Sequence, residues 1–249
     1  MTQDAPRQGT ARTAVVTGAA GGVGSHTVHT LASLGWRVVA VVRTSQDAGS
    51  LERIDGVEAT AVDLSDTDGL SAWAETQLAP RLSDGLDLLV HAAAVASVGP
   101  AADADAATWQ RVLRTNVAAP ALLTGALLPQ VRAARGTIVF INSGAGERAV
   151  PDHAVYAASK HALRGYANTL RLEEAGHGVR VTTIYPGQID TKMLAGIDRT
   201  LDVPFEPDRY IRPQTVADTI AWVAGLGPDA HVTNLDLRPR QEVGAEFNV

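Results

Sequence analysis

The stretch TAVVTGAAGGVG, residues 13–24, decides the fold of this chain. It begins with an apolar run, 13–17, that is typical of a strand buried on both faces of a parallel sheet. A glycine-rich turn and a helical pattern follow. Gly18, Gly22 and Gly24 are spaced G-x-x-x-G-x-G. Such a turn lets backbone N–H groups and the positive end of a helix approach a pyrophosphate, although a plain tight turn also collects glycines.

The same kind of apolar run recurs along the chain, and helical patterns lie between the runs. This alternation predicts βαβ units in a doubly wound α/β sheet of about seven parallel strands. We expect one domain over residues 12–249, after a flexible tail at 1–11. The predicted strands are 13–17, 37–42, 57–62, 86–92, 137–142, 179–185 and 232–237, and the predicted helices are 22–34, 66–78, 104–128, 154–174 and 215–226.

The composition excludes several classes of function. The 21 basic and 27 acidic residues give a net charge of −6, which disfavours nucleic acid and anionic membrane surfaces as partners. The absence of cysteine excludes disulfides, thiolate catalysis and cysteine-ligated metals. The first twelve residues are polar and do not resemble a signal peptide. We therefore expect a soluble cytoplasmic protein that acts on a small molecule.

The end of the second predicted strand bears on the choice of dinucleotide. A carboxylate at this place would bind the ribose 2′-hydroxyl of NAD. Here Arg43, Thr44 and Ser45 follow the strand, with no acidic residue among them. A guanidinium suits the 2′-phosphate of NADP through charge-assisted hydrogen bonds. This pattern favours NADP over NAD, although a solvated surface arginine is the simpler alternative.

Tyr156 and Lys160 lie four residues apart in a predicted helix, so their side chains share one face. A free tyrosine has a pKa of about 10, which is too high for efficient acid–base catalysis near neutrality. A neighbouring ammonium stabilises the phenolate, and we expect it to lower the pKa of Tyr156. Alone, this pair is usually a surface pair, so its meaning depends on the residues around it.

Two further polar residues occur where such a site would need them. Ser143 follows the predicted strand 137–142, at the sheet edge where open α/β folds bind ligands, and it can polarise a carbonyl there. It can also simply close a turn with Gly144. Asn116 interrupts a helical stretch; it can cap or kink that helix, or hold a water that relays protons to Lys160.

The turn T-G-x-x-x-G-x-G at 17–24, then Asn116, Ser143 and Y-x-x-x-K at 156–160 occur together and in this order. In this combination the chain resembles the classical short-chain dehydrogenase/reductase family over nearly all of its length after the tail. The resemblance implies a Rossmann-type fold and hydride transfer between NADP(H) and a carbonyl or alcohol, most simply by a ketone or aldehyde reductase.

The resemblance also implies a role for individual residues. Tyr156 would be the acid/base, and Lys160 would modify its pKa and anchor the ribose. Ser143 would polarise the carbonyl, and Asn116 would join the proton relay. Asp63 would meet the adenine, with the carboxamide near Ile189 and Thr191. The implied cofactor contacts are Gly18, Gly22, Val23, Gly24, Arg43, Thr44, Asp63, Leu64, Ala92, Ala93, Tyr156, Lys160, Pro186, Gly187, Ile189 and Thr191.

Two departures from the family pattern stand out. The family's N-N-A-G motif after the fourth strand appears here as His91-Ala92-Ala93-Ala94. The hydrogen bonds by which the motif's asparagine braces the sheet are therefore lost, or are remade by His91. The chain also lacks the Asp-Gly-Gly ending of many tetrameric members and reads Leu237-Arg238-Pro239-Arg240 instead. We expect a homo-oligomer, with a dimer through the helices of Asn116 and Tyr156 plausible and a tetramer open.

The segment 190–213 is too long for a simple connection and predicts a lid over the substrate, with a surface excursion as the plainer alternative. The residues expected to face the substrate are Ala145, His153, Gln188, Met193 and Leu194. The histidines are scattered and form no H-E-x-x-H pattern, so we expect no metal. Two other functions stay open: a non-redox enzyme on the same fold, of epimerase or lyase type, and a catalytically silent NADP-binding sensor.

Overall fold

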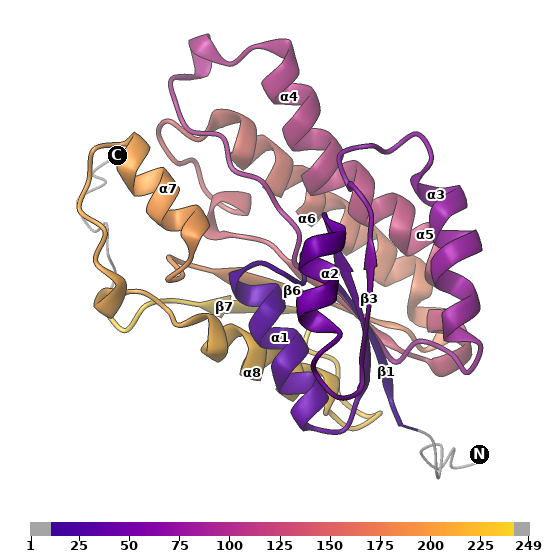
Figure 1. Ribbon diagram of the computed structural model, residues 1–249. Helices are drawn as coiled ribbons and strands as arrows, with labels where there is room; N and C mark the ends of the chain where they lie inside the picture. Colours follow the sequence, from indigo (N-terminus) through magenta and orange to yellow (C-terminus); the bar gives the residue numbers. More distant parts are fainter. Residues whose placement is uncertain (1–10, 242–249) are drawn as a thin grey trace.

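A computed structural model describes residues 11–241 and contains a seven-stranded parallel sheet (Figure 1). The strand order is β3-β2-β1-β4-β5-β6-β7, and every neighbouring pair is parallel. The predicted doubly wound α/β fold is confirmed. Residues 1–10 of the predicted tail lie outside the described residues. The strands are β1 (Thr13–Thr17), β2 (Arg37–Val42), β3 (Val57–Ala61), β4 (Leu88–His91), β5 (Thr137–Ile141), β6 (Arg180–Pro186) and β7 (Asn234–Leu237).

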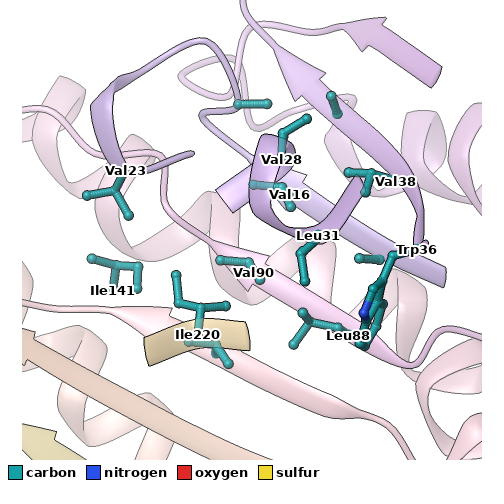
Figure 2. Close-up of a cluster of buried hydrophobic side chains, with 14 of the residues drawn as sticks. Val16, Val23, Val28, Leu31, Trp36, Val38, Leu88, Val90, Ile141 and Ile220 are labelled. Atoms are coloured by element: carbon teal, nitrogen blue, oxygen red, sulfur yellow. The ribbon is translucent and has the colours of Figure 1, made fainter. Parts of the chain in front are cut away.

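One face of the sheet is covered by α1 (Gly22–Ser33) and α8 (Pro213–Ala224), which lie side by side (Figure 1). Alternate strand residues point toward them. Figure 2 shows Val16 of β1 and Val90 of β4 in one buried cluster with Leu31 of α1 and Ile220 of α8. The burial of both strand faces explains why the strands read as continuous apolar runs.

The opposite face is covered by α5 (Ala119–Ala134) and α6 (Ala154–Glu174). The strand residues between those of the first cluster face this side, so Val15 and Phe140 pack with Leu127 of α5 and Leu163 of α6. The helix predicted at 154–174 is therefore found with the same bounds. It carries Tyr156 and Lys160 across the end of the sheet.

The remaining helices show where the sequence prediction was incomplete. The predicted helix 66–78 begins only at residue 70 and consists of an α and a π segment, followed by a 3₁₀ turn; the helix predicted to end at 128 continues to 134. Two short helices, α2 and α7, were not predicted; hydroxyls of Thr44 and Thr191 cap them. The helical elements not yet given are α2 (Ser45–Leu51), α3 (Leu70–Trp73), α4 (Ala106–Leu113), α7 (Lys192–Thr200) and the π turns Ala74–Leu78 and Arg114–Ala118. Short 3₁₀ turns lie at Ala79–Leu82, Ala101–Asp103, Gly144–Gly146, Ala175–His177 and Pro207–Arg209.

One helical stretch, Ala106–Ala134, is long and apolar enough to cross a membrane by length and composition alone. Its inner side carries Leu123, Leu127 and Val131 into the buried clusters of the sheet. Core helices of soluble proteins pass the same test, so this stretch is weak evidence for a membrane span.

Candidate active site

The glycine turn joins β1 to α1, at the edge of the sheet where the carboxyl ends of the parallel strands meet. Gly18 has φ +64°, and a Cβ on it would lie 2.7 Å from the Cα of Ala93. A Cβ on Gly24 would overlap the carbonyl oxygen of Gly18. Side chains at these two positions would therefore break the turn.

The same turn has the donors that a pyrophosphate needs. The first N–H groups of a helix have no partner within the helix, and Gly21 at the start of α1 supplies no side-chain cap. A Cβ on Gly22 would lie 2.7 Å from the Cγ2 of Thr191, so this turn touches the segment that follows β6. The residues present thus fit a dinucleotide whose phosphates rest on α1 and which continues toward Thr191.

The adenosine side of the edge is formed by the ends of β2 and β3. Arg43 is exposed there, and its charge helps to lower the pKa of Asp63; hydrogen bonds from Ser65 are the larger cause. Thr44 is already engaged, because its hydroxyl donates to the carboxylate of Asp47 at 2.7 Å and accepts from the Asp47 N–H at 3.2 Å. The structure therefore brings Arg43 and Asp63 near one another, as the predicted adenosine site requires.

Tyr156, Lys160 and Ser143 meet at the carboxyl ends of β5 and β6. Tyr156 is half-buried on the first turn of α6, and the side chain of Ser143 is close enough to influence the pKa of its phenol. Lys160, on the next turn, is 2 % exposed, and its Nζ lies 5.6 Å from the centroid of the Tyr156 ring. The same Nζ donates to the carbonyl of Ile141 at 2.9 Å, which holds the ammonium at the end of β5.

The pKa values differ from the sequence expectation. Burial raises the pKa of Tyr156 above its ordinary value, and the hydrogen bond with Ser143 opposes that rise. Burial also lowers the pKa of Lys160 to about 8. The expected lowering of the pKa of Tyr156 by Lys160 is wrong for the chain in this structure. The physical reason is that loss of water disfavours the charged form of each group.

Asn116 lies in the π turn between α4 and α5, and its side chain makes three hydrogen bonds. Its Oδ1 accepts from the Val95 N–H at 2.9 Å, and its Nδ2 donates to the Val95 carbonyl at 2.9 Å and to Ser159 Oγ at 3.0 Å. Asn116 therefore ties the loop after β4 to α6, one residue from Lys160. Both hydrogens of Nδ2 are taken. A relay water at Asn116 would therefore have to donate to the second lone pair of Oδ1.

Sequence reasoning missed two residues that position the site. Asn142 is 3 % exposed; its Nδ2 donates to the Lys160 carbonyl at 3.1 Å, and its Oδ1 accepts from the Ser143 N–H at 2.9 Å. Ser159 donates to the Tyr156 carbonyl at 2.7 Å as well as accepting from Asn116. Their proximity to Ser143 and Lys160 in sequence was the one available signal.

His91 shows how this chain manages without the asparagine of the family motif. It is 4 % exposed, stacks on Phe140 with ring centroids 4.9 Å apart, and forms a hydrogen bond through Nε2 with Thr124 Oγ1 at 2.9 Å. Burial lowers the pKa of His91 to about 3, so the imidazole is neutral. His91 thus anchors β4 to α5, while Ala93 reaches β1 through its N–H to Thr17 Oγ1 at 3.3 Å.

The segment after β6 is held by backbone contacts with β7 and with Ile211. The Gly187 N–H donates to the Leu237 carbonyl at 2.7 Å, and Ile211 and Ile189 form a parallel bridge. Thr191 caps α7 by accepting from the Leu194 N–H at 3.3 Å. The predicted lid therefore contains a helix, and its two ends are held together at Ile189 and Ile211.

The residues predicted to face the substrate are not all in one place. His153 precedes α6, and its ring centroid lies 6.4 Å from that of Tyr156. Ala145 is buried in the turn after Ser143 and donates its N–H to Ser143 Oγ at 3.2 Å. Gln188 follows β6, and Met193 and Leu194 lie on α7. The structure links His153 and Ala145 directly to the catalytic group.

A nucleotide-type glycine turn, a Tyr–Lys pair and a serine on one sheet edge define a Rossmann-type oxidoreductase. The family model for short chain dehydrogenase matches residues 12–202. An uncharacterized oxidoreductase of Bacillus subtilis, YmfI, is 32% identical over 85% of this chain and 90% of its own. Serine 3-dehydrogenase of Agrobacterium fabrum is 30% identical over 95% of this chain and 97% of its own.

A solved structure agrees with these matches. A metagenomic short-chain oxidoreductase in complex with NADP has 32% identity, with a TM-score of 0.77 over 93% of this chain and 98% of that one. The chain therefore belongs to the short-chain dehydrogenase family, whose members are oxidoreductases that bind NAD(P).

Proposed function

We propose that this protein is an NADP(H)-dependent ketone or aldehyde reductase that exchanges a hydride between the cofactor and a carbonyl or secondary alcohol. The observation that carries the proposal is the grouping of Tyr156, the neighbouring Ser143 and the buried Lys160 at the sheet edge that the glycine turn also reaches. This grouping supplies a proton donor, a carbonyl polariser and a cation within one short stretch of the edge.

Each residue has a defined task in this proposal. The cofactor would supply or accept the hydride. Tyr156 donates the proton to the substrate oxygen, and its raised pKa keeps the phenol protonated at neutral pH. Ser143 orients the carbonyl oxygen toward Tyr156. Lys160, with a pKa of about 8, is largely charged at neutral pH and stabilises the phenolate that forms.

The cofactor would lie along the edge from Arg43 to Thr191. Gly18, Gly22 and Gly24 would bring the backbone to its phosphates, and Arg43 would bind the 2′-phosphate of NADP(H). NADP-bound relatives, such as the metagenomic oxidoreductase, support this preference. We further propose a cytoplasmic homo-oligomer, with a dimer as the first expectation.

An NADPH-oxidation screen over ketones, aldehydes, quinones and 3-oxoacyl thioesters tests the proposal. We expect turnover with at least one class of carbonyl, and the turnover should disappear in Tyr156→Phe. A matched control is Tyr166→Phe, which changes a tyrosine farther along α6. NADPH binding without oxidation of any substrate class would favour a silent sensor. Substrate conversion without a net change in NADPH would favour a non-redox enzyme of epimerase or lyase type.

A further inference from the structure

A pocket of about 200 Å³ lies between the end of β7 and the start of α8, and three arginines are among its lining residues. Arg212 precedes α8, and Arg238 and Arg240 follow β7. Tyr210 and Thr215 also line it. We call it the arginine pocket. It is built from the part of the chain in which the family's Asp-Gly-Gly ending is replaced, and the proposed reductase mechanism does not use it.

The charges of this pocket are only partly compensated. Arg238 lies 3.9 Å from a carboxylate oxygen of Glu147 and 3.5 Å from one of Asp236. Within residues 11–241, neither Arg212 nor Arg240 has a carboxylate within ion-pair distance. Both are exposed. These two guanidiniums line one pocket together with Arg238, so positive charge gathers there in a chain whose net charge is −6. The positive charges of the guanidiniums repel one another, and a bound anion would offset the electrostatic free energy of that repulsion.

The start of α8 adds to the attraction for an anion. The helix has twelve residues, and Arg212, which precedes it, gives no side-chain cap. Pro213 has no N–H and the Thr215 N–H bonds to the Arg212 carbonyl at 2.9 Å, so the contribution of this helix end is mainly that of its dipole. The positive end of the helix therefore points out beside Arg212 and Thr215. The planar guanidinium forks of Arg212 and Arg240 match the oxygens of a carboxylate or a phosphate, which accept two parallel hydrogen bonds.

The pocket adjoins the catalytic edge and is separate from the adenosine site. The Leu237 carbonyl accepts the Gly187 N–H at 2.7 Å, so the strand that leads into the pocket borders the segment after β6. The guanidinium of Arg238 packs against Gly144, where a Cβ would lie 2.7 Å from its Nη1. Arg43, by contrast, follows β2, and β1, β4, β5 and β6 separate β2 from β7 in the sheet.

We infer that the arginine pocket binds a small anionic group, a carboxylate or a phosphate, next to the catalytic edge. The group has two chemical sources: the charged end of the substrate, or a free anion such as inorganic phosphate. Anion binding itself is independent of the proposed function. The substrate source rests on that function, and it would make this protein a reductase of oxo acids or phosphorylated carbonyl compounds.

The first test is a calorimetric titration of the full chain with inorganic phosphate in the presence of saturating NADP⁺. Saturation with NADP⁺ removes any binding of phosphate at the cofactor phosphate sites. We expect phosphate to bind, and Arg212→Gln and Arg240→Gln each to weaken it by about tenfold or more. Arg238 is left unchanged because it contacts the turn after Ser143.

Arg53→Gln is the matched control, since it removes an exposed arginine after α2 and should leave the phosphate affinity unchanged. The same titration is repeated without NADP⁺. Three results would overturn the inference: no phosphate binding by the unmodified chain in either titration, binding by Arg212→Gln and Arg240→Gln as tight as by the unmodified chain, or phosphate binding that occurs only without NADP⁺. The last result would assign the pocket to the cofactor.

The second test separates the two sources of the anion. The kcat/KM values of an oxo acid and of its methyl ester are compared in the unmodified chain and in Arg212→Gln and Arg240→Gln. If the substrate carries the anion, the acid-to-ester ratio should fall by about tenfold in both variants. An unchanged ratio with weakened phosphate binding would identify a free anion as the ligand. Phosphate binding without turnover of any carbonyl would refute the reductase and leave the anion site standing.

Discussion

The Nζ of Lys160 lies 5.6 Å from the ring centroid of Tyr156, on the next turn of the same helix. Its hydrogen bond to the Ile141 carbonyl fixes this ammonium at the end of β5. The Lys160 carbonyl, in turn, accepts from Asn142. The catalytic helix is thus joined to β5 through both the side chain and the backbone of Lys160. The spacing of the pair comes from the helix, and its position over the sheet comes from these two bonds.

Tyr156→Phe should nearly abolish carbonyl reduction and leave NADPH binding intact. The change removes one oxygen and keeps the ring, so the packing of α6 is preserved while the proton donor is lost. General acid catalysis contributes a factor of about 10²–10⁴, and we expect kcat to fall by that amount. Stopped-flow reduction and a fluorescence titration with NADPH measure the two quantities. Near-normal ketone reduction would refute the tyrosine mechanism.

Lys160→Ala should reduce both the turnover rate and the affinity for NADPH, because one ammonium serves the phenol and the cofactor ribose in the proposed site. The alanine also leaves a cavity at a position that is 2 % exposed. Lys160→Met is therefore the matched variant, since it removes the charge and keeps most of the volume. If Lys160→Met retained both rate and affinity, the defect in Lys160→Ala would be one of packing alone.

Arg43→Ala should weaken NADPH binding by about one to two powers of ten and leave NADH binding nearly unchanged. The reason is that a charge-assisted contact to the 2′-phosphate contributes roughly 1.5–3 kcal/mol. Titration of the unmodified protein and of the variant with both cofactors measures the effect. Equal affinities of the unmodified protein for NADPH and NADH would contradict the assignment.

His91 should make the stability of the fold sensitive to acid. Its folded pKa of about 3 lies below the ordinary histidine value of 6.5, so the unfolded chain binds a proton at this ring that the folded chain does not. The free energy of unfolding is therefore fully retained above pH 6.5 and falls as the pH decreases toward 3. At pH 4.5 the loss from this group is roughly 2–3 kcal/mol.

Urea unfolding at pH 7 and pH 4.5 measures that loss. His91→Asn should unfold with a smaller difference between the two pH values than the unmodified protein. His161→Asn, at an exposed position of α6, is the control and should behave as the unmodified protein does. An identical pH dependence in His91→Asn would show that other groups cause the acid sensitivity.

The segment 190–213 should gain protection from hydrogen exchange when substrate and cofactor bind. Its ends are joined at Ile189 and Ile211, while Val203 and Phe205 between them are 46% and 38% exposed. Exposed apolar side chains on a lid are covered when the lid closes over a ligand. Exchange measured with and without NADP⁺ and substrate tests this. High protection in both states would identify the segment as a fixed surface excursion.

The number of strands, their places along the chain and the helix of Tyr156 follow from the sequence. Continuous apolar runs predict strands that are buried on both faces, and the helical periodicity between them predicts the helices. Both patterns can be recognised without any tertiary structure. The glycine turn was equally readable, because G-x-x-x-G-x-G reflects backbone geometry that only glycine allows at Gly18 and Gly24. The short helices α2 and α7 were missed, since seven to nine residues carry little periodicity and begin at a single threonine cap.

The electrostatic character of the site was decided by the tertiary structure. The i, i+4 spacing places Lys160 near Tyr156, but only the fold determines how much water each one loses, and that loss changes the direction of the pKa shift of Tyr156. The bonds of Asn116 to Val95 and of Asn142 to Lys160 likewise join residues of different elements. The sequence by itself determined which elements form and which residues carry the chemistry, because those depend on local pattern. Burial, partners and the pocket of Arg212, Arg238 and Arg240 depend on contacts between distant segments, so only the folded chain decides them.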